Sequence, residues 1–340
     1  MRRLHPALAG LAALMCVAVS AGCSSSSPSS SAPAASSLTA SASSSSTAPE
    51  SSSTAPELSS ITVGVLPAVN TATLYLAIKE GYFSQVGLTV TPQQLAVSTE
   101  AIPGLLHGTL DISSGNLDSY IAADAAGVLP LRILNETAVC SPDTLAVLAK
   151  PSSGITSAAD LAGKTIAVAS KPDIQTLTID KLVGPTEAKT LQFVAMPFQN
   201  MLAALGAGRV DAIATLQPYI AAAEHTLGAS IVLDECSGAD AGVPLGGYFT
   251  TASWLAKYPN TARAFQSAMN QAQVLANRNP ALVRQILPTF MKVTAQVAKG
   301  VVIPQFATGL NASQIQFIAN LAYAGGEAKS LVNVTQLLVG

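Results

Sequence analysis

The sequence predicts an α/β protein with two lobes, in which parallel-rich sheets are flanked by helices and a cleft separates the lobes. Three observations support this prediction. Short apolar runs alternate with helical patterns between residues 61 and 233. The alternation forms two successive series, which we assign to two lobes. After Gly247 the chain is expected to be mainly helical.

The first series contains four short apolar runs that are typical of buried strands. These runs cover 61–66, 88–95, 110–112 and 131–134, and the helices expected between them cover 73–80, 98–106 and 117–126. Gly81 closes the first helix. Ser98 or Thr99 is the expected N-cap of the second helix, because a hydroxyl can accept a hydrogen bond from a free backbone N–H.

The second series repeats the pattern, and a helical segment follows it. Its expected strands cover 144–149, 165–169, 192–195, 211–214 and 231–233, and its helices cover 157–161, 175–182, 199–205 and 219–226. The C-terminal helices are expected at 260–276, 281–287, 295–301 and 313–323. Asn260 is the expected N-cap of the longest helix, and the Asn279-Pro280 pair is its expected stop.

The N-terminus has the layout of a secretory signal, with a cationic start at residues 1–3 and an apolar run at 4–19. That run is shorter than the roughly 20 apolar residues of a membrane-spanning helix. Ser20-Ala21-Gly22-Cys23 resembles the bacterial lipoprotein box, although Ser20 stands where that family usually has leucine. The resemblance implies a signal peptide at 1–22 and lipid on Cys23. The alternative is an ordinary signal cut after small residues.

Residues 23–58 are expected to form a disordered tether between the lipid and the folded part. The segment consists almost wholly of Ser, Ala, Thr and Pro. Such a composition cannot bury enough apolar surface to fold. At about 5–6 Å times the square root of its length, the tether reaches roughly 30–35 Å. The folded part would therefore stay close to the outer face of the bacterial cytoplasmic membrane.

The composition excludes several classes of function. The net charge is −2 and charged residues make up 11% of the chain, so no basic surface for nucleic acid is indicated. No apolar run long enough to span a membrane follows the signal. His107 and His225 stand next to no candidate nucleophile, and the sequence contains no metalloprotease, nucleophile-elbow or phosphate-loop motif. The sequence therefore indicates no enzyme and no metal site.

Five segments together resemble the periplasmic substrate-binding proteins of ABC importers. They are 61–90, 129–134, 158–168, 201–220 and 246–265. The chain is most similar to the subgroup that takes up nitrate, sulfonates, taurine and pyrimidine precursors of thiamin. It departs from that subgroup at Gln217-Pro218, where many relatives carry Glu-Pro.

The resemblance implies a type II-like periplasmic-binding-protein fold. Its first lobe would comprise 59–141 and 247–340, and its second lobe 142–246. It also implies a monomer that binds a small organic or anionic solute without a cofactor and delivers it to an ABC permease. Two alternatives remain open: a binding module that signals to a membrane receptor, and an enzyme like the pyrimidine-precursor synthases. The cysteine-rich motif of those enzymes is absent from the sequence.

Candidate ligand contacts lie in the loops that follow the strands, because ligands of open α/β sheets bind beyond the carboxyl ends of strands, near helix N-termini. The candidates are Asn70, Thr71, Ser98, Thr99, Ser114, Asn116, Asp173, Gln199, Gln217, Tyr219 and Tyr248. Ser98, Asn116 and Gln199 could instead only cap helices, and the two tyrosines could instead pack at the edge between the lobes. Lys171 is the one cation in these loops, which argues against a strongly anionic ligand.

Cys140 and Cys236 are expected to form a disulfide, because an exported pair is more commonly bonded than free. Each cysteine follows the last expected strand of a lobe, where the chain crosses between lobes. Crossing segments that run side by side would bring the two Cα atoms within the roughly 4.4–6.8 Å that a disulfide requires. The alternative is two separate buried thiols.

Overall fold

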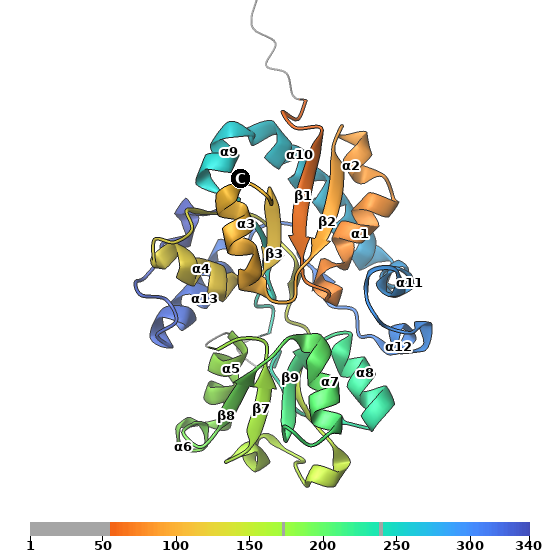
Figure 1. The fold of residues 1–340 in the computed structure, drawn as a ribbon, viewed down its shortest axis with the longest axis vertical. Helices are drawn as coiled ribbons and strands as arrows, with labels where there is room; N and C mark the ends of the chain where they lie inside the picture. Colours follow the sequence, from red (N-terminus) through yellow and green to blue (C-terminus); the bar gives the residue numbers. More distant parts are fainter. Residues whose placement is uncertain (1–54, 172–173, 238–240) are drawn as a thin grey trace, which may run out of the picture. The chain divides into compact units, whose positions relative to one another are not determined.

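A computed structural model describes residues 55–171, 174–237 and 241–340 (Figure 1). The predicted signal peptide, Cys23, most of the predicted tether and Asp173 lie outside the described residues. The described chain has two lobes, each built on a five-stranded mixed sheet covered by helices. The predicted α/β fold with parallel-rich sheets is confirmed.

The first lobe is built on a sheet with the strand order β2-β1-β3-β11-β4. Strand β1 pairs in parallel with β2 and β3, and β11 pairs antiparallel with β3 and β4. The strands are β1 (Ser60–Val65), β2 (Thr89–Gln94), β3 (Ile112–Gly115), β4 (Leu131–Glu136) and β11 (Gly247–Thr251). The helices around them are α1 (Ala72–Lys79), α2 (Tyr82–Gln85), α3 (Ile102–His107), α4 (Leu117–Ala125), α9 (Ala252–Lys257) and α10 (Pro259–Arg278).

Strand β11 corrects the expectation that the chain turns helical directly after Gly247. All five of its residues are buried, and it lies between β3 and β4. Its sequence, GYFTT, contains the aromatic and β-branched residues that fit a pleated, buried surface. The strand returns the chain to the first lobe after the second lobe is complete.

The second lobe is built on a sheet with the strand order β10-β6-β9-β7-β8. Strand β7 pairs in parallel with β8 and β9, whereas β6 pairs antiparallel with β9 and β10. The strands are β6 (Leu145–Ala149), β7 (Thr165–Val168), β8 (Gln192–Ala195), β9 (Ala212–Leu216) and β10 (Ser230–Asp234). The helices are α5 (Ile174–Val183), α6 (Pro185–Ala188), α7 (Phe198–Gly206) and α8 (Tyr219–Leu227). The predicted helix at 157–161 is a 3-10 turn at Ala158–Leu161.

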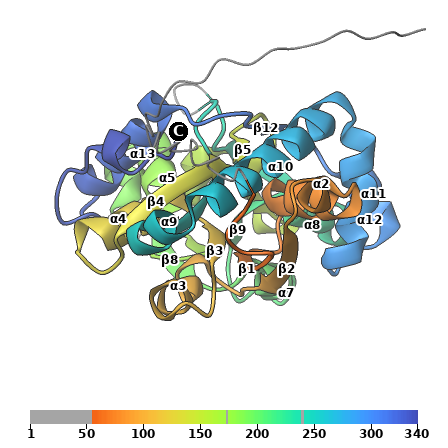
Figure 2. The same cartoon turned by 90° about the horizontal axis from the view of Figure 1, so that it is seen from above.

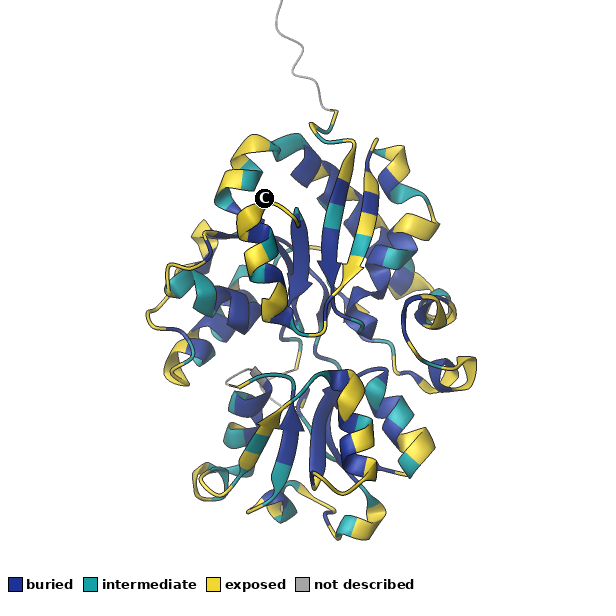
Figure 3. Ribbon diagram, viewed as in Figure 1, coloured by how far each residue is buried: buried dark blue, intermediate teal, exposed yellow. Residues whose placement is uncertain are grey.

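Three further helices complete the chain: α11 (Pro280–Phe290), α12 (Ala295–Gly300) and α13 (Ala312–Ala324). Helix α11 packs against α1, and Tyr75 of α1 stacks on Phe290 of α11. Helix α12 packs against α11, beside which it lies in both views (Figures 1 and 2), and against α8. A two-stranded sheet joins β5 (Ala138–Val139) to β12 (Gln305–Phe306). Figure 3 shows that the central strands of both sheets are buried, whereas the helices alternate between buried and exposed residues. Within the part of the chain described here, no helix is both long and apolar enough to span a membrane.

Helix α13 packs against α4 of the first lobe and also against α5 of the second lobe. Gly325 directly follows α13, and a Cβ at this position would lie 2.1 Å from Cδ2 of Leu177 in α5. Glycine therefore lets the end of α13 approach α5 without displacing the Leu177 side chain. The helix forms a wall that both lobes share.

The start of α10 is capped from outside the helix, so the expectation that Asn260 is its N-cap is wrong. The N-cap is Tyr258, whose side chain makes no capping bond, and Pro259 follows it. The carboxylate of Glu57 accepts hydrogen bonds from the backbone N–H groups of Asn260 (2.9 Å) and Thr261 (2.7 Å). Burial disfavours the charged form, but these hydrogen bonds hold the pKa of Glu57 below its ordinary value. Glu57 thus attaches the last residues of the predicted tether to the first lobe.

Candidate ligand-binding site

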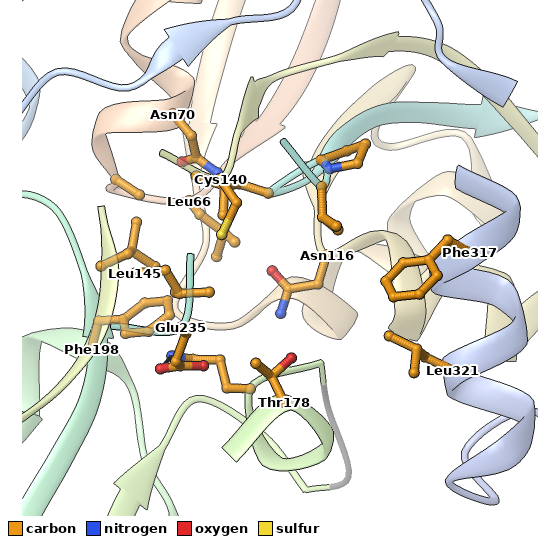
Figure 4. Close-up of a pocket in the computed structure, with 16 residues that line it drawn as sticks. Leu66, Asn70, Asn116, Cys140, Leu145, Thr178, Phe198, Glu235, Phe317 and Leu321 are labelled. Atoms are coloured by element: carbon orange, nitrogen blue, oxygen red, sulfur yellow. Dashed lines mark hydrogen bonds between the residues drawn. The ribbon is translucent and has the colours of Figure 1, made fainter. Parts of the chain in front are cut away.

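A pocket opens between the two lobes, and both of them supply its walls (Figure 4). The space between its walls is about 700 Å³, including the part that is open to solvent. We call it the interlobe pocket. Its lining residues are Leu66, Ala68, Asn70, Asn116, Cys140, Leu145, Gln175, Thr178, Phe198, Leu216, Glu235, Val243, Pro244, Leu245, Phe317 and Leu321.

The first lobe contributes two amide side chains, both of which the sequence predicts. Asn70 lies in the 3-10 turn after β1 and is 8% exposed, and its Oδ1 has no hydrogen-bond partner among the described residues. Asn116 is the N-cap residue of α4, yet its side chain makes no capping bond. Figure 4 shows the Asn116 amide pointing into the cavity. Capping alone therefore does not account for Asn116.

The second lobe contributes a hydrogen-bonded pair that the sequence analysis missed. Nε2 of Gln175, in the first turn of α5, donates to Oε1 of Glu235 over 3.2 Å. Glu235 follows β10 and is fully buried, and Gln175 is 4% exposed. The sequence contained one signal for Glu235. It is a charged residue in a loop after a strand, next to a cysteine that was predicted to form a disulfide.

Aromatic and aliphatic side chains form the rest of the pocket. Phe198 is the first residue of α7, and its ring stacks on Tyr219, with the ring centroids 5.8 Å apart. Phe317 and Leu321 are contributed by α13, and Figure 4 shows them on one side of the cavity. The pocket therefore combines apolar walls with a few polar groups, as is typical of sites for small molecules.

The predicted disulfide between Cys140 and Cys236 is confirmed, with a Cα–Cα distance of 5.0 Å. It lies where the chain crosses between the lobes. The Cys140 N–H donates to the carbonyl of Val243 over 2.7 Å, and Leu245 donates to Ala138 over 2.7 Å, so the two crossing segments run side by side as expected. Cys140 and the segment from Val243 to Leu245 also line the pocket. The segments that cross between the lobes thus also form part of the pocket wall.

Ser98 and Thr99 line a smaller side pocket, which shares Leu66, Asn116 and Phe198 with the interlobe pocket. The expectation that Ser98 or Thr99 caps the helix is wrong. The N-cap is Val97, and the Ser98 hydroxyl accepts a hydrogen bond from the backbone N–H of Asn116 over 2.8 Å. Ser98 thus holds Asn116 at the junction of the two pockets.

The remaining predicted residues that the structure describes lie outside the lining of both pockets. Thr71 donates to the carbonyls of Leu66 and Ala68, and the Ser114 hydroxyl accepts from the Leu66 N–H, so both shape the loop after β1. Gln199 is exposed on α7. Tyr248 is fully buried beside Phe265 in the core of the first lobe, and this burial raises its pKa.

Gln217 and Tyr219 connect the lobes. The Gln217 carbonyl accepts from the Val69 N–H over 3.1 Å, and its Nε2 donates to the Asp143 carbonyl over 3.0 Å. The Tyr219 hydroxyl donates to the carbonyl of Pro67, and burial raises the pKa of this phenol to about 12. Both residues therefore hold the first and second lobes together beside the pocket.

Among the described residues that line the interlobe pocket, Glu235 is the one acidic side chain, and none is Lys or Arg. Across the described ranges, no group of three or more His, Cys, Asp or Glu residues could hold a metal ion.

Residues 68–282 match the family model described as NMT1/THI5 like. No curated protein matches the sequence. Many solved structures share the fold, and three of them are described here. The alkanesulfonate-binding protein SsuA from Xanthomonas axonopodis pv. citri, bound to MOPS, has a TM-score of 0.71 at 20% identity, covering 83% of this chain and 99% of that one.

The periplasmic aliphatic sulphonate-binding protein SsuA from Escherichia coli has a TM-score of 0.67 at 18% identity, covering 83% of this chain and 92% of that one. The periplasmic nitrate-binding protein NrtA from Synechocystis PCC 6803 has a TM-score of 0.71 at 15% identity, covering 84% of this chain and 87% of that one. All three are named as binding proteins. At these identities the likeness establishes the fold of this chain.

Proposed function

Because the chain belongs to the NMT1/THI5-like family, we propose that it is an extracytoplasmic solute-binding protein that captures a small molecule between its lobes and delivers it to an ABC permease. One observation carries the proposal. The interlobe pocket has walls from both lobes, with buried polar atoms that have no described protein partner, such as Oδ1 of Asn70 and Oε1 of Gln175. A ligand would satisfy such atoms, which are costly to leave unpaired.

Binding without turnover is part of this proposal. The described residues of the lining contribute amides, one hydroxyl and one carboxyl group, and no nucleophile–base pair lies among these residues. A ligand that contacts both lobes would stabilise the arrangement in which the lobes are closed around it. The permease would recognise this closed arrangement.

The lobe boundaries at 141/142 and 246/247 are part of this proposal. The order of strands supports them, because β1 to β4 and β11 belong to the first sheet and β6 to β10 to the second. The proposal also includes the lipid on Cys23 and the tether behind it, which would keep the protein on the outer face of the cytoplasmic membrane. The composition of residues 23–58 supports the tether.

A thermal-shift screen of the full chain tests the proposed function. The panel comprises sulfonates, nitrate, pyrimidines, aromatic acids and organic amines. A true ligand at 100 times its dissociation constant adds about 2.7 kcal/mol to the free energy of unfolding. We expect at least one class to stabilise the wild-type chain and to lose this effect in Asn116→Leu. If no class stabilises the chain, the proposed function is wrong.

A further inference from the structure

We propose that the solute is uncharged and carries a primary carboxamide or urea head group on an apolar body. This inference rests on the proposed function and assigns a chemical class to the solute of the same pocket. The head group would bind to two asparagines of the first lobe, Asn70 and Asn116, and the body would lie against the apolar side chains that form most of the lining.

Asn70 and Asn116 lie on neighbouring loops at one edge of the first sheet. Strands β1 and β3 pair in parallel, so the loops that follow them leave the sheet at the same edge. Both side chains line the interlobe pocket, and Figure 4 shows them on the same cavity. A single ligand in the pocket therefore meets both amides.

Both amides have hydrogen-bonding groups that the described protein does not use. Oδ1 of Asn70 lacks a partner among the described residues, and this side chain is 8% exposed. The Asn116 amide makes no capping bond and points into the cavity (Figure 4). Whichever way this amide is turned, it presents one acceptor oxygen and one donor nitrogen. The first lobe therefore offers at least two acceptors and one donor to a ligand.

A primary carboxamide or a urea group complements this set. Its carbonyl oxygen accepts from the Asn116 nitrogen, and its two or more N–H groups donate to the oxygens of Asn70 and Asn116. Sulfonate and nitrate only accept hydrogen bonds and would leave both oxygens unpaired, whereas an ammonium only donates and would leave the Asn116 nitrogen unpaired. A hydroxyl has one hydrogen and cannot donate to both oxygens. Leaving such buried groups unpaired is costly.

The lining provides no cation for an anionic head group. None of the described lining residues is Lys or Arg, and the residues between the described ranges, 172–173 and 238–240, contain neither type. Lys171 and Lys181 of the second lobe are exposed, so water screens their charge. Because burying an ion without a partner is strongly unfavourable, an uncharged head group fits this pocket better than an anion.

The position of Asn116 is fixed before a ligand arrives. The buried Ser98 hydroxyl accepts a hydrogen bond from the Asn116 backbone N–H over 2.8 Å. Leu66 and Phe198 line the pocket on both sides of this junction, since they belong to the interlobe pocket and to the side pocket. An apolar body that packs against them would remain in contact with protein while its head group binds Asn116.

Calorimetric titration of the full chain with four matched probes tests the inference. Hydrocinnamamide, benzylacetone, hydrocinnamate and phenylpropylamine share one phenethyl body and carry a carboxamide, a methyl ketone, a carboxylate and an ammonium group. The ketone has the shape of the carboxamide and lacks only its N–H donors. We expect the carboxamide to bind more than about tenfold tighter than each of the other three probes.

Three variants locate the effect. Asn116→Asp keeps the shape of the side chain and a good N-cap residue, and we expect it to weaken carboxamide binding by more than about tenfold. Asn70→Leu removes an acceptor that the ketone cannot use, so it should bring the affinities of carboxamide and ketone closer together. Asn279→Asp makes the first change at an exposed position outside both pockets and should leave all four affinities unchanged.

The outcomes separate the two proposals. A carboxylate, ammonium or ketone probe that binds as tightly as the carboxamide would overturn the ligand class and leave solute capture intact. The same holds for a carboxamide affinity that Asn116→Asp leaves unchanged. Failure of all four probes at millimolar concentration would also overturn the ligand class. The proposed function fails only if the broad thermal-shift panel contains no ligand as well.

Discussion

The phenolic hydroxyl of Tyr219 donates a 2.9 Å hydrogen bond to the main-chain carbonyl of Pro67. Tyr219 begins α8 in the second lobe, and Pro67 follows β1 in the first lobe. The neighbouring bond from the Val69 N–H to the Gln217 carbonyl joins the same two loops. Because these loops flank Asn70 and Phe198, contact between the lobes and the shape of the pocket are linked.

Tyr219→Phe should therefore weaken solute binding without unfolding the protein. The change removes one interlobe hydrogen bond, worth about 0.5–1.5 kcal/mol, and keeps the ring that stacks on Phe198. We expect calorimetry with any solute that stabilises the wild type to show a loss of about two- to tenfold in affinity. Tyr323→Phe, at an exposed position on α13, is the control. Equal affinities for the two variants would contradict this role of Tyr219.

The disulfide should contribute strongly to stability. Its cysteines are 96 residues apart in the sequence, so the bond restricts a long loop of the unfolded chain. The entropic model gives roughly 4–5 kcal/mol for such a loop, and measured gains are often smaller. We expect the Cys140→Ser, Cys236→Ser double variant to unfold at lower denaturant concentration than the wild type. Alkylation of exported, unreduced protein followed by mass spectrometry should find neither thiol labelled. Labelling at both positions would refute the bond.

Glu57→Gln should destabilise the first lobe at neutral pH. The carboxylate accepts N–H groups at the start of α10, and losing its charge should cost about 0.5–1 kcal/mol for this largely exposed group. The pKa of Glu57 is lowered in the folded state, so its contribution is fully present above the ordinary glutamate pKa of about 4.3 and is lost as pH falls through the lowered folded value.

Urea unfolding at several pH values checks this prediction. The difference between wild type and Glu57→Gln should be largest near neutrality and should shrink below about pH 4. Glu80→Gln, which removes an exposed carboxylate outside this cap, is the control. A difference that stays constant down to acidic pH would rule out the charged cap.

Gly325→Ala should disturb the packing of α13 on α5. The added Cβ would come within 2.1 Å of Cδ2 of Leu177, so the leucine side chain must move. Because the end of this side chain is flexible, we expect a cost near the lower limit of the roughly 1–3 kcal/mol that overpacking typically costs. Leu177→Ala should recover part of that cost, so the double variant should be more stable than the sum of the single changes predicts. Gly300→Ala, where nothing lies within 4 Å of the added Cβ, is the control. If the changes in the free energy of unfolding caused by Gly325→Ala and Leu177→Ala are additive, the two residues are not in contact.

Cys23→Ala should release the protein from the membrane. The small residues before Cys23 and the tether after it motivate the lipid anchor. Fractionation of cells should move the variant from the membrane to the soluble extracytoplasmic fraction or to unprocessed precursor. Retention of a processed variant in the membrane would contradict lipid on Cys23.

The alternation of short apolar runs and helical patterns was enough to predict the α/β fold, and the position of each cysteine after a terminal strand was enough to predict the disulfide. Strand β11 was not predicted, although its sequence, GYFTT, is typical of a strand. The cap of α10 could not be predicted, since Glu57 is about 200 residues away in the sequence.

Local sequence identified part of the pocket. Asn70 and Asn116 were found because they follow strands and precede helices. Gln175 and Glu235 were missed because their pairing depends on how α5 lies against the end of β10, which is a tertiary relationship. Tyr248 was a candidate because of its aromatic ring, but its position in β11 directs the ring to Phe265 in the core.

Native mass spectrometry of the full chain, incubated with the small-molecule fraction of a cell extract, tests the central claim of solute capture most directly. The wild type should retain one small molecule per chain. Leu321→Trp, which fills the interlobe pocket from α13, should lose it, and Leu331→Trp, at a position 63% exposed and outside the pocket lining, should keep it. A wild-type chain that retains nothing, or a Leu321→Trp chain that binds as well as the wild type, would contradict capture of a solute between the lobes.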